Sequence, residues 1–160
     1  MGDRTVSGEA LIASIFEVSR QVAEAEDVSS VLPVIVSLSR RMLVFDNFII
    51  FLPEGGELQP YFARAVGRGR TKEADLPWGT DVAEKIYYQD ETISFQEEIG
   101  DRVEDRTNAR LYLGAPLEQG SKKIGVLVLI RFGGPEYTEK DIARFEYVAE
   151  NVAHLLEREA

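Results

Sequence analysis

Apolar residues recur along this chain at two spacings, and the spacings predict where helices and strands lie. A helical spacing covers Ser7–Ala23, with a serine in the N-cap position. A second helix is predicted over Ser30–Leu43, where Pro33 is tolerated because the N–H it lacks is not needed near a helix start. The last helix follows Thr138, which forms with Asp141 the pattern of a capping box.

Runs rich in β-branched and aromatic residues predict five strands. They are Asp46–Leu52, Leu58–Val66, Thr92–Phe95, Leu111–Leu117 and Lys123–Phe132. A short helix is expected over Gly79–Gln89, between two predicted loops at Gly67–Pro77 and Gln96–Ala109. Strands in hairpins with helices at both ends predict one antiparallel α+β domain over residues 1–160, with residues 1–7 as a disordered tail.

Composition and charge exclude several classes of partner. The formal charge of −10 disfavours nucleic acid and anionic membrane surfaces, because both are bound through Lys and Arg. The longest apolar run, Ile124–Ile130, is the length of a strand, so we predict no membrane span. The amino terminus lacks the pattern of a signal peptide, and the expected location is the cytoplasm. The chain contains no cysteine, which excludes thiol chemistry and disulfides.

The order of these elements and five motifs resemble a GAF domain over about residues 8 to 158. The motifs are Asp46–Leu52, Leu76–Gly79, Gly114–Leu117, Ile124–Leu129 and Pro135–Asp141. The resemblance implies a PAS-related central antiparallel sheet with the first, second and last helices on one face. It also implies that the short helix and long loops cover the other face and enclose a pocket for a small molecule, as in sensing modules of bacterial signalling proteins.

Departures from known subfamilies narrow the choice of ligand, and no cofactor is predicted. Bilin-binding and methionine sulfoxide reductase members use cysteines, and this chain has none. Haem requires an axial ligand, and the one histidine, His154, is expected beside the core stripe of the last helix. Ile49 stands where cyclic-nucleotide binders have a small polar residue. The acidic residues between 97 and 105 lack the spacing of a calcium loop, so no metal site is predicted.

Candidate ligand-binding residues come from strand alternation and from the resemblance. Alternation places Asn47, Ile49 and Phe51 on one face of the first strand. The resemblance adds residues of the central segment and of the neighbouring strands, which are Trp78, Val82, Ala83, Ile86, Tyr87, Phe95, Arg110 and Leu111. Two interpretations stay open: the aromatic residues line a cavity for a small apolar or aromatic ligand, or they fill the same space as core. Arg110 could contact an anion or could be a solvated loop residue.

No nucleophile lies beside a base in any recognisable pattern, so we predict that the protein is not an enzyme. The predicted function is a regulatory domain that binds an unidentified small molecule and relays the event through its terminal helices to an output domain in a longer parent chain. The alternative is a ligand-free module for dimerisation and signal relay.

A homodimer is predicted through the first and last helices. The first helix has two apolar rows, one formed by Leu11, Ile15, Val18 and Val22 and the other by Ile12, Phe16 and Ala23. The last helix ends with Val152, Leu155 and Leu156. Charged residues at Leu11 and Ile15 are expected to leave a folded monomer.

Overall fold

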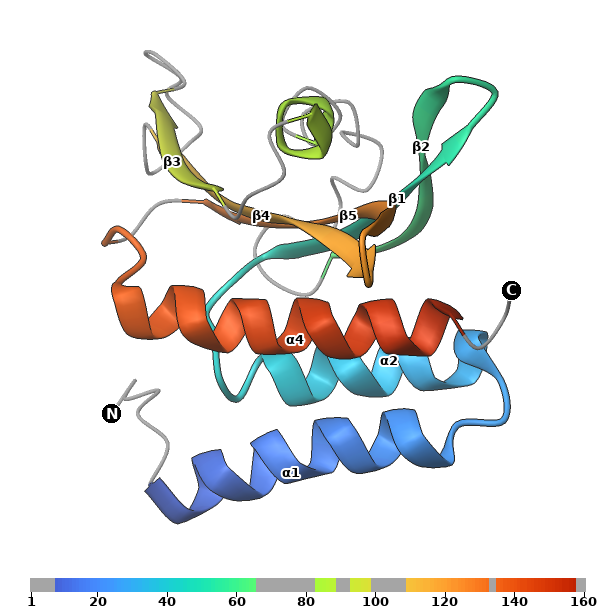
Figure 1. Ribbon diagram of the computed structural model, residues 1–160. Helices are drawn as coiled ribbons and strands as arrows, with labels where there is room; N and C mark the ends of the chain where they lie inside the picture. Colours follow the sequence, from blue (N-terminus) through green and yellow to red (C-terminus); the bar gives the residue numbers. More distant parts are fainter. Residues whose placement is uncertain (1–7, 66–82, 89–92, 99–108, 133–134, 158–160) are drawn as a thin grey trace.

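The computed structural model of the chain describes residues 8–65, 83–88, 93–98, 109–132 and 135–157 (Figure 1). Its helices are α1 (Gly8–Glu24), α2 (Val28–Ser39), a short helix at residues 83–88, and α4 (Glu139–Glu157). The strands are β1 (Asn47–Glu54), β2 (Glu57–Ala65), β3 (Ile93–Glu98), β4 (Ala109–Gln119) and β5 (Lys122–Phe132). They form one antiparallel five-stranded sheet in the order β2-β1-β5-β4-β3. The predicted α+β class is confirmed.

Two tight turns fix the registers of the hairpins. Glu54 pairs with Glu57, so Gly55 and Gly56 alone connect β1 to β2, with φ values of 64° and 87°. Positive φ at both central residues gives the backbone twist that suits a two-residue hairpin, and glycine adopts it without steric cost. Gly120, with φ of 60°, has the same role between β4 and β5. The predicted turns at both places are confirmed.

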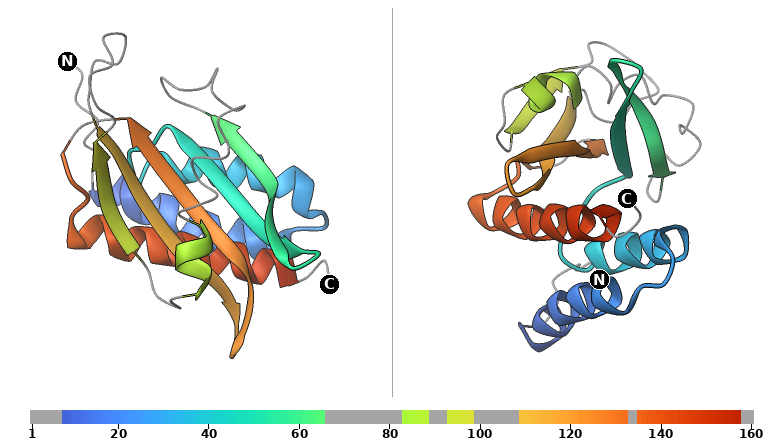
Figure 2. Two further views of the ribbon diagram at one scale, coloured as in Figure 1. Left: turned by 90° about the horizontal axis from the view of Figure 1, so that it is seen from above. Right: turned by 45° about the vertical axis from the view of Figure 1, so that its right-hand side comes forward.

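The helices lie in two layers beneath the sheet. α4 and α2 pack directly under it, and α1 packs on α2 and α4 as an outer layer (Figures 1 and 2). The predicted face is therefore right for all three helices, but α1 is separated from the strands by the other two. The main core fills the space between sheet and helices, and it includes Phe48, Ile50, Ile35 and Phe145.

The amino terminus of α4 has the predicted capping box. The Asp141 backbone N–H donates to Thr138 Oγ1 at 3.2 Å, and the Thr138 N–H donates to Asp141 Oδ2 at 2.8 Å. Tyr137, just before the cap, packs with Ile142 against the main core, as a hydrophobic staple requires. The hydroxyl of Tyr137 donates to the Val44 carbonyl oxygen at 2.7 Å, which ties this end of α4 to the segment entering β1.

Two predicted boundaries are wrong. The second helix was expected over Ser30–Leu43 but begins at Val28, after Asp27, and ends at Ser39. β3 continues to Glu98, into the segment predicted as an acidic loop, because all six of its residues pair with β4. Ladder hydrogen bonds and cross-strand contacts outweigh the weak strand propensity of glutamate there.

The two apolar rows of α1 have different environments. Val18 and Val22 are buried, and Leu11 and Ile15 pack half-buried against the main core. In the other row, Phe16 is 71% exposed and Ile12 is 55% exposed. Val152, Leu155 and Leu156 of α4 are buried within the same chain. Leu11 and Ile15 therefore already have partners in their own subunit, and the dimer through the first and last helices stays a prediction.

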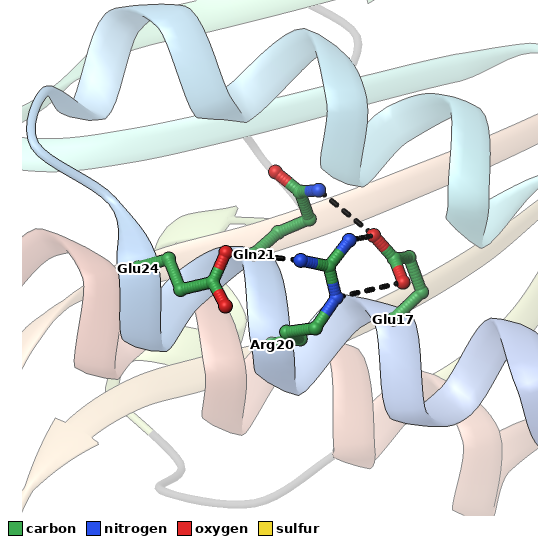
Figure 3. Close-up of polar contacts among 4 residues, drawn as sticks. All are labelled: Glu17, Arg20, Gln21 and Glu24. Carbon is green, nitrogen blue, oxygen red and sulfur yellow. Dashed lines mark hydrogen bonds and ion pairs between the residues drawn. The ribbon is translucent and has the colours of Figure 1, made fainter.

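A network of charged and polar side chains also lies along α1. Arg20 contacts Glu17 and Glu24, and Gln21 Nε2 donates to Glu17 Oε2 at 2.8 Å (Figure 3). The hydrogen bond from Arg20 is the main cause that lowers the pKa of Glu17. Pairs three and four residues apart lie on one side of a helix, so this network supports α1 locally.

Candidate functional site

A second apolar cluster covers the face of the sheet opposite the long helices. We call it the upper cluster. Its members are buried and comprise Ile49, Phe51, Leu58, Ala83, Ile86, Tyr112, Val126, Val128 and Ile130. The strands supply the floor because their residues alternate between the two faces, and Phe48 and Ile50 point instead to the main core. Ala83 and Ile86 come from the short helix at residues 83–88, which lies on the side of the sheet opposite the long helices (Figure 1).

The short helix sits directly on the floor because β4 has a glycine beneath it. A Cβ atom built on Gly114 would lie 1.8 Å from Ile86 Cδ1 and 3.1 Å from Ile86 Cγ1. Any larger residue at position 114 would therefore push Ile86 or the short helix away. Ala83 and Ile86 are both fully buried in this position.

Lys123, near the start of β5, holds the carboxyl end of the short helix. Its ammonium group donates a hydrogen bond to the backbone carbonyl oxygen of Tyr87. The same Nζ lies 4.8 Å from the centroid of the Tyr87 ring, a cation–π distance. A cation at the last carbonyls of a helix is also favoured by the helix dipole. Lys123 thus links the short helix to the start of β5, the central strand of the sheet.

Asn47 is a polar residue in the same row of β1 as Ile49 and Phe51. It is 5% exposed, and its Oδ1 atom is buried without a hydrogen-bond partner among the residues that the structure describes. Its cross-strand neighbours are Ala65 on β2 and Ile130 on β5. Sequence reasoning placed Asn47 on this face but gave it no role, although a polar residue in an apolar row was the signal that could have identified it.

Comparison with known families identifies the architecture. The model of the GAF domain family matches residues 27–156. The chain belongs to the GAF domain family. A comparison with curated proteins finds no match.

Solved structures share this fold at low sequence identity, and two of the following three are GAF domains. The GAF domain of a phosphoenolpyruvate-protein phosphotransferase from Coxiella burnetii aligns with a TM-score of 0.70 and 15% identity, over 96% of each chain. The free methionine-R-sulfoxide reductase of Neisseria meningitidis aligns with a TM-score of 0.68 and 14% identity, over 96% of this chain and 93% of that one. The GAF domain of a two-component sensor histidine kinase from Bacillus halodurans aligns with a TM-score of 0.57 and 16% identity, over 84% of this chain and 96% of that one.

Within this GAF domain, the structure brings together most of the predicted site residues that it describes. Ile49, Phe51, Ala83 and Ile86 belong to the upper cluster, and Tyr87 packs at its edge. Their role in ligand binding stays a prediction.

Leu111 is a correction. It lies two residues before Leu113 in the same strand, and Leu113 packs in the main core. Strand alternation therefore puts Leu111 on the helical side of the sheet, and Tyr112 is the β4 residue in the upper cluster.

The other predicted residues fall partly or wholly outside the description. Trp78 and Val82 lie outside the described residues. The backbone of Phe95 pairs with Tyr112, and that of Arg110 pairs with Glu97 and Phe132, while their side chains are not among those described. His154 is exposed on α4. Among the described residues, no group of three or more His, Asp or Glu residues could hold a metal ion. No helix in the described ranges is long and apolar enough to cross a membrane.

Two cavities lined by described residues lie away from the upper cluster. One, of about 440 Å³, lies between Leu52, Tyr61, Ile124 and Leu156, with Lys122 at its edge. The other, of about 450 Å³, separates α1 from α4 and is lined by Ser19, Tyr147, Asn151 and His154 among others. Beside this second cavity, Tyr147 contacts Ser19 and donates to the Ile15 carbonyl oxygen at 2.6 Å, so α1 and α4 are joined by polar contacts.

Proposed function

We propose that this GAF domain is a regulatory sensor that binds a small molecule between the short helix and the floor of the upper cluster. The observation that carries the proposal is the seating of Ile86 against Gly114, over a floor formed by four strands, β1, β2, β4 and β5. A ligand entering between them would displace Ile86, so ligand binding and the position of the short helix would be coupled. In this proposal the domain acts by binding and not by catalysis.

The sheet and the helices offer a route for relay. Adjacent residues of β1 and β5 belong alternately to the upper cluster and to the main core, where α4 packs. α4 in turn holds α1 through Tyr147. A ligand that favours one arrangement of these layers would shift the population toward it, and an output domain in a longer chain would sense the change.

The test is a ligand screen with a blocked variant. Nucleotides, aromatic acids and common metabolites are screened by thermal shift, and native mass spectrometry of freshly purified protein looks for a ligand that co-purifies. At a concentration about 100-fold above its dissociation constant, a ligand raises the free energy of unfolding by about 2.7 kcal/mol.

Val128→Phe, on the floor, should abolish the shift. Val34→Phe, at an exposed position of α2, should preserve it. Circular dichroism checks that both variants are folded. If no compound shifts the wild type and no ligand co-purifies, the sensor proposal fails.

A ligand-free relay module is the second candidate, and the same contact favours it. Ile86 already fills the space above Gly114, so the upper cluster can serve as a core without a ligand. This candidate predicts that Val128→Phe lowers stability without changing any response to small molecules, whereas the sensor predicts loss of binding.

The proposal includes a homodimer formed through the outer row of α1. Ile12 and Phe16 are large apolar side chains exposed on the layer farthest from the sheet. The variant Ile12→Lys/Phe16→Lys should sediment as a folded monomer, while the wild type sediments at twice that mass. Ala13→Lys, at an exposed position beside them, is the matched control and should remain dimeric. A wild type that is monomeric at high concentration excludes this interface.

A further inference from the structure

Asn47 is the feature of the upper face that packing alone does not explain. The floor of the upper cluster is otherwise built from apolar side chains and one tyrosine. The amide oxygen of Asn47 is removed from solvent, and no residue in the described part of the chain donates a hydrogen bond to it. Such a group loses its hydrogen bonds to water on folding, and buried acceptors are therefore almost always paired in native proteins.

The residues directly opposite Asn47 in the sheet, and the next residue in its own row, cannot supply a donor from their side chains. Ala65 and Ile130 lie directly opposite on the two neighbouring strands, and Ile49 follows in the same row. All three side chains are hydrocarbon. Directly opposed side chains point to the same face, so Asn47 has apolar neighbours on both flanks and along its own strand.

We propose that Asn47 is the polar recognition group of the ligand site, and that the ligand is an uncharged, mainly apolar ring compound carrying an N–H or O–H donor. This inference rests on the sensor role proposed above. The ring would lie over Ile49 and Val128, and its donor would reach Asn47 Oδ1. The separation along β1 between Asn47 and Ile49 is about 7 Å, which suits a small fused ring system.

The lack of charge among the described residues of the upper cluster sets the class of ligand that we propose. No described member of the upper cluster is ionisable at neutral pH, and an unpaired ion buried there would be strongly disfavoured. A neutral ligand with a hydrogen-bond donor should bind more favourably than a charged one, because its donor satisfies an acceptor that is already desolvated. A site built around a hydrogen bond discriminates strongly against an analogue that lacks the donor, since the site's polar group is then left unpaired.

Two pairs of ring compounds provide the test on the 160-residue chain. Indole is compared with indene, and naphthol with naphthalene; in each pair only the first compound has a donor. Dissociation constants are measured by titration calorimetry for the wild type, for Asn47→Leu, and for the control Asn151→Leu. Asn151 is a buried asparagine on α4 whose Nδ2 donates to the Tyr147 carbonyl oxygen at 3.0 Å, away from the floor.

The wild type and Asn151→Leu should bind the donor compound of at least one pair about tenfold more tightly than its partner, a difference of about 1.4 kcal/mol. Asn47→Leu should bind both members of that pair almost equally. Without ligand, Asn47→Leu should raise the urea midpoint, because it removes an unpaired polar atom, whereas Asn151→Leu should lower it by removing a formed hydrogen bond.

Three results would overturn the inference. If the wild type binds both members of each pair with equal affinity, Asn47 does not recognise a donor on the ligand, and the sensor role would stand. A urea midpoint that falls in Asn47→Leu as much as in Asn151→Leu would assign Asn47 a structural hydrogen bond, for instance to water. No binding of any of the four compounds would exclude this ligand class, and the wider screen with Val128→Phe would then decide the sensor role separately.

Discussion

Gly114 gives the sharpest test of how the short helix rests on the sheet. In Gly114→Ala the new Cβ would lie 1.8 Å from Ile86 Cδ1, far inside van der Waals contact. The clashing atom is the end of a flexible side chain, so the variant should fold with Ile86 or the short helix displaced. Overpacking of this kind costs about 1–3 kcal/mol, and replacing a strand glycine by alanine returns about 0.5–1 kcal/mol.

The net destabilisation of Gly114→Ala should therefore be between about 0 and 2.5 kcal/mol, and it should depend on Ile86. Ile86→Val removes the Cδ1 atom and by itself costs about 0.5–1.5 kcal/mol. In that background the contact at 1.8 Å no longer exists and only the contact at 3.1 Å to Cγ1 remains, so Gly114→Ala should cost much less than in the wild type. A double-mutant cycle measured by urea unfolding should then give a coupling energy of about 1–2 kcal/mol.

Gly125→Ala is the matched control for this cycle. Its Cβ would lie 2.4 Å from the backbone carbonyl oxygen of Phe51, which cannot move aside as a side chain can. Gly125→Ala should be strongly destabilising, and Ile86→Val should not rescue it. A stabilising effect of Gly114→Ala in the wild type would refute the reasoning, as would an equal cost in both backgrounds, because either result means that Ile86 does not rest on Gly114.

Three further predictions concern the contacts at the ends of elements. Thr138→Ala should lower the free energy of unfolding by about 1 kcal/mol because it removes the cap of α4, and Thr138→Ser should retain most of that stability. Equal urea midpoints for the two variants would contradict the capping box. Lys123→Met should speed amide hydrogen exchange in residues 83–88 by removing the donor to the Tyr87 carbonyl, while exchange in the main core stays slow; unchanged exchange at 83–88 would show that Lys123 does not hold the helix. Burial raises the pKa of Tyr137, so its contribution to stability is complete below the unfolded pKa of about 10 and is lost as pH rises through the higher folded pKa. Urea midpoints measured at increasing alkaline pH should therefore fall more steeply for the wild type than for Tyr137→Phe, and parallel curves would count against a buried hydroxyl.

Local sequence signals determined the elements that depend on nearby residues. The capping box of α4 is correct because Thr138 and Asp141 satisfy each other's backbone within one helical turn. The glycine turn of the first hairpin is correct because glycine itself adopts positive φ without steric cost. The faces of β1 are also correct, since alternation follows from the pleat of a strand and places Ile49 and Phe51 together.

Contacts between distant residues decided the rest. The composition of α1 showed two apolar rows, but only the packing of α2 and α4 selected which row is buried and left Phe16 exposed. β3 is longer than its composition predicts because β4 pairs with it.

The candidate site was likewise determined partly by local sequence signals and partly by contacts between distant residues. The sequence named Ile86 and, by alternation, the face of Asn47. It could not show that Ile86 rests on Gly114, or that the Asn47 oxygen has no partner within the described ranges. Both facts depend on which atoms the folded chain brings within a few ångströms of each other, and that proximity is set by the tertiary packing of the whole domain and not by the spacing of residues along the chain.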